Sequence, residues 1–337
     1  MRMVRAALLG VLFSAGCGGP EPHTDNIPTV PADYEFTKPG APTEDNEPER
    51  VVTLTEARRG FKTKLVRKEA DKHGVPEPPP NLFRVVRYSS PAGTMSAYLS
   101  QSPSDGAKHP AIIWLFGGFN NGIGQTAWAK QDASNDQSAS AFRKAGIVMM
   151  YPSLRGGNGS AGYREAFFGE VNDVLAAADF LAKQDFVDPT RIYLGGHSTG
   201  GTLALLTAES TDRFRAVFSF GPVENVGDYD HKDLPFNFSN ERELRLRAPD
   251  RWLDSIQSPV FVFEGVNRPG NIAALESLEQ KCSNSAVHFH SVRGADHFSI
   301  LAPVTQLVAT KILRDSGPTT TTTIAFTEKE LNDLFAK

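Results

Sequence analysis

Short apolar runs alternate with stretches of helical periodicity along residues 81–315. In the runs, every position or every second position is hydrophobic, as expected of strands buried on one or both faces. They predict strands at 82–88, 94–99, 111–116, 147–151, 191–195, 216–220, 260–263 and 287–292. Apolar residues at helical spacing predict helices at 138–145, 170–183, 202–209, 271–282 and 301–313. This alternation predicts an α/β fold with a mostly parallel, twisted sheet and helices on both faces.

The first residues follow another pattern. Arg2 and Arg5 precede an apolar stretch at 6–13, which is too short to span a bilayer, and small residues then lead to Cys17. This arrangement resembles a bacterial lipoprotein signal. The resemblance implies a signal peptide at 1–16, lipidation of Cys17, and a lipid anchor to a membrane on the periplasmic or surface side of the cell envelope. Secretion without an anchor, and a cytoplasmic location, are the alternatives.

The remaining polar segments divide the chain further. Seven prolines and eight acidic residues between 18 and 50 indicate a disordered tether. The expected organisation is a signal peptide at 1–16, a tether at 17–50, a basic extension with a proline-rich linker at 51–80, the α/β domain at 81–315, and a threonine-rich linker with a short helix at 316–337.

Composition narrows the class of protein. Of 337 residues, 40% are hydrophobic and 22% charged, which is ordinary for a globular chain. The formal net charge of −4, with no long basic stripe, gives no reason to expect a nucleic-acid partner. Two cysteines exclude a disulfide framework. No apolar run reaches the roughly 18 residues of a membrane-spanning helix.

One pentapeptide carries candidate chemistry. Gly196-His197-Ser198-Thr199-Gly200 lies between a predicted strand and a predicted helix. A serine at such a glycine-flanked turn is typical of a nucleophile elbow, in which the serine oxygen stands above the sheet edge. The alternative is an ordinary glycine turn. We therefore predict that Ser198 is a nucleophile on an α/β-hydrolase fold.

A serine nucleophile needs a base and an acid. His297 follows the last predicted strand, where it could reach Ser198, although a surface or core histidine is the alternative. A zinc site formed by His288, His290 and His297 is a weaker alternative, because no fourth ligand has suitable spacing. The acid of such folds precedes the histidine in the chain, which favours Glu264 at the end of the strand at 260–263. Glu224 and Asp296 are the other candidates.

Two glycine-rich turns need assignment. The turn at 116–119 follows a strand, and its Gly118 and Phe119 fit one half of an oxyanion hole, with the backbone N–H of Thr199 as the other half. A plain glycine turn is the alternative. Residues 157–162 match G-x-G-x-x-G, but they neither open the first strand–helix unit nor precede an acidic strand end, so no dinucleotide site is expected.

Several motifs in order resemble one known family. They lie at 152–157, 173–181, 187–192, 196–200 and 294–298. Together they resemble the catalytic domain of the prolyl oligopeptidase family, over roughly 81–315. The resemblance implies Ser198 as nucleophile and His297 as base. The family's acid does not carry over, because its Gly-x-x-Asp is Gly-Val-Asn-Arg at 265–268. The residues printed ahead of the domain are too few for the family's β-propeller, so we do not expect one to gate access by peptide size.

The sequence thus predicts a serine hydrolase that cleaves amide or ester bonds through an acyl-enzyme. Peptides are the first substrate class, on the strength of the resemblance alone. A carboxylesterase or dienelactone-type hydrolase acting on small esters is one alternative. A surface lipoprotein that binds without catalysis, its acid lost, is another. The residues at 221–256 are expected to shape the substrate pocket, and no metal or organic cofactor is required.

Overall fold

The computed structural model describes residues 52–316 and 322–336. The predicted signal peptide at 1–16 and the whole predicted tether at 17–50, including Cys17, lie outside the described residues. No helix within the described ranges is long and apolar enough to cross a membrane.

An eight-stranded sheet forms the centre of the described chain, in the order β1-β2-β4-β3-β5-β6-β7-β8. β1 pairs antiparallel with β2, and β2 antiparallel with β4; all later pairs are parallel. The strands are β1 Phe83–Ser90, β2 Gly93–Ser100, β3 His109–Leu115, β4 Val148–Pro152, β5 Val187–His197, β6 Val217–Phe220, β7 Val260–Gly265 and β8 Val287–Val292. The predicted fold class is confirmed, and each predicted strand is present.

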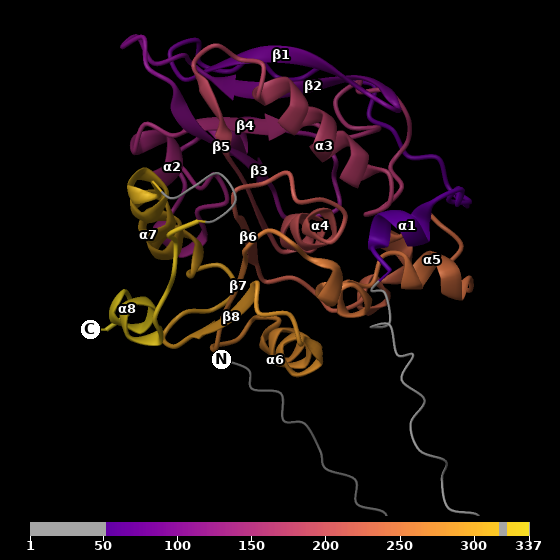
Figure 1. The fold of residues 1–337 in the computed structure, drawn as a ribbon. Coiled ribbons are helices and arrows are strands. Elements are labelled where there is room, and N and C mark those ends of the chain that lie inside the picture. Colours follow the sequence, from indigo (N-terminus) through magenta and orange to yellow (C-terminus); the bar gives the residue numbers. More distant parts are fainter. Residues whose placement is uncertain (1–51, 317–321, 337) are drawn as a thin grey trace, which may run out of the picture. The chain divides into compact units, whose positions relative to one another are not determined.

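Helices cover both faces of the sheet (Figure 1). The α-helices are α1 Leu54–Arg58, α2 Ala141–Lys144, α3 Glu170–Leu181, α4 Thr199–Ala208, α5 Glu241–Arg245, α6 Ile272–Lys281, α7 Leu301–Arg314 and α8 Glu328–Asp333. Short 3₁₀ turns lie at Gln125–Ala127, Ala133–Asn135, Val226–Asp228, His231–Asp233, Pro249–Arg251 and Leu253–Ser255. The core cluster with α3, α4 and α6 lies on one face, and the cluster with α2, α7 and α8 on the other.

Strand periodicity explains these two clusters. Along β7, Val260 and Val262 belong to the first cluster, whereas Phe261 and Phe263 belong to the second. Successive side chains of a strand point to opposite faces, so a run of apolar residues supplies both cores at once. This is why the central strands are apolar at nearly every consecutive position of the sequence.

The residues before β1 pack on this domain. Leu54 of α1 is buried, and the Arg58 guanidinium donates to the backbone oxygens of Leu246, Phe167 and Phe168. Burial, and next the nearby charge of Arg247, lower the pKa of Arg58 to about 9. The sequence predicted a basic extension at 51–80 but not its helix α1.

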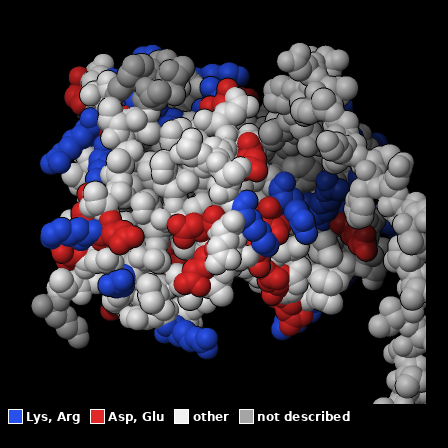
Figure 2. Space-filling model, turned by 60° about the horizontal axis from the view of Figure 1, so that its bottom comes forward, with Lys and Arg blue, Asp and Glu red and all other residues white. Residues whose placement is uncertain are grey.

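Positively and negatively charged side chains are intermixed on the visible surface of the protein. On the face shown in Figure 2, lysine and arginine alternate with aspartate and glutamate, and uncharged residues separate the groups. That face therefore offers no continuous basic surface.

Candidate active site

Ser198 lies between the end of β5 and the start of α4. Its backbone angles are φ 55° and ψ −118°. A positive φ is uncommon for a residue other than glycine. Such strain costs on the order of 1–3 kcal/mol and persists where the surrounding structure imposes it. Here the Ser198 N–H donates to the oxygen of Phe220 on β6, at 2.8 Å. The strand–turn–helix arrangement is that of a nucleophile elbow.

The flanking glycines allow this turn. A Cβ on Gly196 would collide with the backbone oxygen of Gly200, and a Cβ on Gly200 would collide with the backbone oxygen of Leu115 on β3. The backbone of the turn therefore lies in close contact with the first turn of α4 and with β3. Both positions exclude any larger residue.

Glu264 and His297 are in contact at the carboxyl ends of β7 and β8. Nδ1 of His297 lies 2.8 Å from Oε2 of Glu264. Glu264 is fully buried near the end of β7, and His297 follows the paired strand β8 with 8% of its surface exposed. Because Nδ1 donates its proton to the carboxylate, Nε2 is the ring nitrogen left to accept a proton from a serine.

Backbone groups hold Glu264 in place. The N–H of Gly265 donates to Oε1 at 2.8 Å, and the N–H of Asn271 donates to Oε2 at 3.2 Å. The Asn271 side chain donates in turn to the oxygen of Gly221, at 2.9 Å. These donors compensate the burial of a carboxylate. The sequence did not point to Asn271, because it acts through a loop contact seven residues beyond the acid.

A two-residue segment links the nucleophile to the histidine. Phe220 accepts the N–H of Ser198, and Gly221 lies against the ring of His297, where a Cβ would collide with Cε1. Gly221 has φ 59°, which also favours glycine.

Ser198 Oγ has no hydrogen bond to His297 in the described chain. Bonds of this kind often tighten only in the substrate complex.

The two other acid candidates lie elsewhere. Glu224 binds Ser277 and the ammonium group of Lys281, the latter at 2.7 Å. Oδ1 of Asp296 accepts the N–H groups of Phe298 and Ser299, at 2.9 and 2.8 Å. Of the three carboxylates, Glu264 is the one that the structure brings to His297.

The other candidate histidines belong to the sheet. His288 and His290 stack on the ring of Phe261, with centroids 5.0 and 6.3 Å apart. Over residues 52–316 and 322–336, no three or more side chains of metal-ligating type come together.

The predicted oxyanion groups lie beside the elbow. Thr199 is the first residue of α4, so its N–H has no carbonyl partner within the helix. Thr199 Oγ1 donates to the oxygen of Gly118 at 2.6 Å, which fixes the loop of Gly118 and Phe119 against the helix. A Cβ on Gly117 would stand 3.2 Å from Cβ of Ser198. The loop after β3 and the start of α4 thus both lie beside Ser198.

His197 is a site residue that sequence reasoning missed. Its Nε2 donates to the oxygen of His297 at 2.9 Å, and its Nδ1 lies 3.0 Å from the amide group of Gln137. The two histidine rings lie 4.4 Å apart. Burial, and next the nearby His297, lower the pKa of His197 to about 3, so it stays neutral at ordinary pH. His197 supports the backbone of His297.

The glycine-rich segment at 157–162 is structural. A Cβ on Gly157 would collide with the backbone of Asn121, and the next helix begins only at Glu170. Arg155, just before it, pairs with Asp173 at 2.9 Å in a buried ion pair. The segment packs the loop after β4 against the loop after β3.

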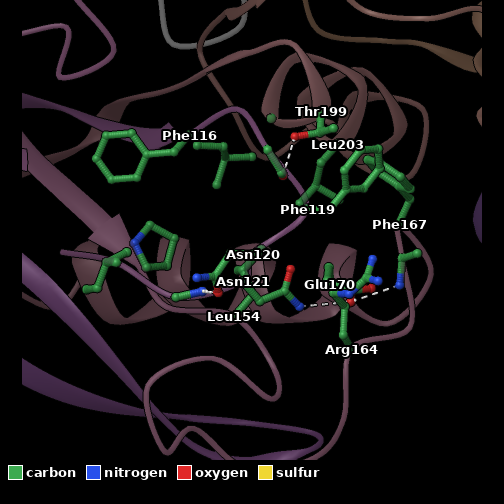
Figure 3. A pocket seen from close by; sticks show the side chains of 17 residues that line it. Phe116, Phe119, Asn120, Asn121, Leu154, Arg164, Phe167, Glu170, Thr199 and Leu203 are labelled. Carbon is green, nitrogen blue, oxygen red and sulfur yellow. Dashed lines mark hydrogen bonds between the residues drawn. The ribbon is translucent and has the colours of Figure 1, made fainter. Parts of the chain in front are cut away.

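Two pockets adjoin the elbow. The first, which we call the oxyanion-side pocket, is lined by Gly118, Phe119, Phe167, Glu170, Thr199 and Leu203 among others (Figure 3). The second, the histidine-side pocket, is lined by Gly117, Gly118, Gln137, His197, Ser198 and Phe298 among others.

The central part of the chain is similar to known proteins. Residues 133–252 match the prolyl oligopeptidase family. Prolyl oligopeptidase A of Amanita bisporigera is 28% identical over 167 residues, which cover 46% of this chain and 21% of that protein. Prolyl endopeptidase of Elizabethkingia meningoseptica is 30% identical over 128 residues, which cover 35% of this chain and 17% of that protein. The match thus spans about a fifth of either relative.

The fold of the chain is also similar to that of a solved structure. A puromycin-hydrolyzing peptidase of Mycobacterium tuberculosis aligns with a TM-score of 0.55 and 22% identity, over 68% of this chain and 38% of that chain. Similarity at this level concerns the fold. The chain has the α/β-hydrolase fold, and its central part is similar to the prolyl oligopeptidase family of serine peptidases.

Proposed function

We propose that this protein is a serine hydrolase that cleaves peptide bonds through an acyl-enzyme. Ser198 is the nucleophile, His297 the general base and acid, and Glu264 the carboxylate that orients the imidazole. The observation that carries the proposal is the 2.8 Å contact between Glu264 and Nδ1 of His297, at the sheet edge where the Ser198 elbow stands. The peptide substrate class rests on the similarity to the prolyl oligopeptidase family.

The first half of the reaction forms the acyl-enzyme. Ser198 Oγ attacks the carbonyl carbon while its proton passes to Nε2 of His297. Glu264 stabilises the imidazolium that results. The N–H of Thr199 and those of the loop at Gly118 and Phe119 receive the negative charge on the carbonyl oxygen. The C–N bond then breaks as His297 returns the proton to the leaving nitrogen.

The second half of the reaction hydrolyses the acyl-enzyme and releases the carboxylic acid product. Water attacks the ester carbonyl of the acyl-enzyme, His297 takes a proton from that water, and the same backbone donors stabilise the second oxyanion. His297 then protonates Ser198 Oγ as the carboxylic acid leaves. All of these groups belong to this chain.

Covalent labelling tests the proposal. A fluorophosphonate should react with the wild-type protein, and Ser198→Ala should abolish labelling and lower turnover of a peptide amide by several orders of magnitude while melting normally. An unlabelled wild-type protein would favour a binding lipoprotein, and faster turnover of short-chain esters than of peptide amides would favour an esterase. The presence of Glu264 beside His297 argues against a lost acid.

We further propose that Cys17 carries a lipid that anchors the protein to a bacterial envelope membrane. The proposal rests on the charged, apolar and small residues before Cys17. Cys17→Ser should move the protein from the membrane fraction to the soluble fraction. A soluble wild-type protein lacking residues 1–16 would indicate secretion instead.

A further inference from the structure

The two pockets beside the elbow take different parts of a substrate. In acyl transfer the carbonyl oxygen points to the oxyanion donors, and the leaving group lies toward the histidine that protonates it. Thr199 and Gly118 line the oxyanion-side pocket. His197 and Phe298, the neighbours of His297, line the histidine-side pocket. The oxyanion-side pocket is therefore placed to receive the side chain on the acyl side of the cleaved bond.

The walls of the oxyanion-side pocket are apolar and held in place. Phe119 and Phe167 both pack on the ring of Tyr229, with centroids 5.0 and 5.7 Å apart. The Tyr229 hydroxyl lies 3.0 Å from Oγ1 of Thr202 on α4. Leu203 of the same helix completes this wall. An apolar stem fits such a surface.

A buried carboxylate also lines the pocket. Figure 3 shows Glu170 away from Thr199, across the pocket. Glu170 is 1% exposed, and its Oε1 accepts from the Asn121 side chain and from the N–H groups of Glu165 and Ala166, at 2.7–3.1 Å. Its Oε2 is buried and has no hydrogen-bond partner in the described chain. A buried acceptor without a donor costs roughly 1–3 kcal/mol, which a bound donor would recover.

The neighbouring charges limit which donor fits. Arg164 lines the same pocket and is held by Glu69, whose Oε2 lies 2.7 Å from its Nε, and by the backbone oxygen of Asp233. A cation entering the pocket would meet this guanidinium, and an anion would meet the Glu170 carboxylate. An uncharged group with an N–H or O–H donor avoids both repulsions.

We propose that Glu170 makes the enzyme select an acyl-side residue with an apolar stem and an uncharged hydrogen-bond donor at its end, such as a primary carboxamide. The inference rests on the proposed serine hydrolase function. Oε2 of Glu170 accepts the hydrogen bond, while Phe119, Phe167 and Leu203 enclose the stem.

Aminoalkylphosphonate diphenyl esters test this selection on the full chain. They react with an active serine at a rate that depends on the side chain beside the phosphorus. Analogues of norleucine, glutamine and lysine have stems of similar length with an apolar, a carboxamide and an ammonium end. The glutamine analogue should label Ser198 at least about tenfold faster than either of the others. This ranking needs no variant.

Two matched variants locate the effect. Glu170→Gln can keep the Oε1 contacts while placing an NH₂ group where Oε2 stood, so the preference for the glutamine analogue should fall below about twofold. Glu165→Gln is the control, because Glu165 pairs with Arg155 at 2.7 Å and does not line the pocket. It should retain the preference. Thermal melting shows that each variant is folded.

Several results would overturn the inference. They are equal or faster labelling by the norleucine analogue, fastest labelling by the lysine analogue, or an unchanged preference in Glu170→Gln. Failure of all three phosphonates to label a protein that reacts with a fluorophosphonate would also overturn it and leave the proposed function intact. Failure of the fluorophosphonate as well would overturn the proposed function itself.

Discussion

The two halves of the candidate site are built in different ways. The nucleophile half occupies five consecutive residues, 196–200, and its geometry comes from a strained serine between two glycines that tolerate close backbone contacts. The proton-transfer half combines Glu264 near the end of β7, His297 after β8 and Gly221 after β6. Its members meet only because parallel strands end at the same edge of the sheet.

This difference determines what each half tolerates. In the nucleophile half, backbone sterics decide, so nearly any added atom at Gly196 or Gly200 is excluded. In the proton-transfer half, hydrogen bonds and burial decide. A change there can leave the fold intact while the imidazole loses its orientation. The following substitutions test that separation.

The largest effect is expected at the acid. Glu264→Gln keeps the shape but removes the negative charge beside Nδ1 of His297, and it can reverse the tautomer of the ring. Turnover of a peptide amide should fall by at least about 10²-fold, with an unchanged melting curve. Steady-state kinetics on one substrate measure the fall.

Glu224→Gln is the matched control. It removes a carboxylate that binds Lys281 and Ser277 rather than the histidine, so turnover should change by less than about twofold. Equal losses in both variants would mean that Glu264 does not orient His297.

A smaller loss is expected when a methyl group is placed between the two halves. Gly221→Ala introduces a Cβ that collides with the His297 ring, at a residue with φ 59°. We expect turnover to fall on the order of tenfold or more, with a stability loss of about 1–3 kcal/mol from strain. Gly74→Ala, where an added Cβ meets nothing within 4 Å, should change neither quantity. Normal kinetics in Gly221→Ala would show that the ring position is not constrained from this side.

The support of the histidine backbone should matter less still. His197→Phe keeps an aromatic ring but removes the hydrogen bond to the oxygen of His297. One such bond is worth about 1 kcal/mol, so kcat should fall by roughly fivefold to tenfold while KM stays unchanged. An altered KM with unchanged kcat would instead assign His197 to substrate binding.

The same contrast explains what the sequence predicted. The strands, the sheet class and the elbow follow from periodicity and from glycine spacing within a few residues, and the structure contains them all. Glu264 was the favoured acid because it ends a strand, and it lies next to His297. Asn271, Gly221 and His197 could not be predicted, because each acts through one contact with a residue 7 to 100 positions away. Helix α1 was missed because it is five residues long and surrounded by basic residues.

The smallest expected effect concerns a buried histidine outside the site. His290 on β8 lies between the rings of Phe263 and Phe326, at 5.2 and 5.7 Å, and burial lowers its pKa to about 4. An unfolded chain protonates this histidine near its usual pKa of about 6.5. Between pH 6.5 and 4 the unfolded state therefore binds more protons than the folded state, and the free energy of unfolding falls as the pH falls.

His290→Leu should reduce that dependence. Denaturant unfolding at pH 7 and pH 5 should show a drop in unfolding free energy for the wild-type protein that is roughly 1–2 kcal/mol larger than for the variant. His197, with a pKa of about 3, remains in both proteins and keeps part of the dependence in each. Identical drops in the two proteins would mean that His290 is protonated as easily when folded as when unfolded. The expected result would separate a histidine buried by packing from His297, the proposed general base, which is buried beside Glu264.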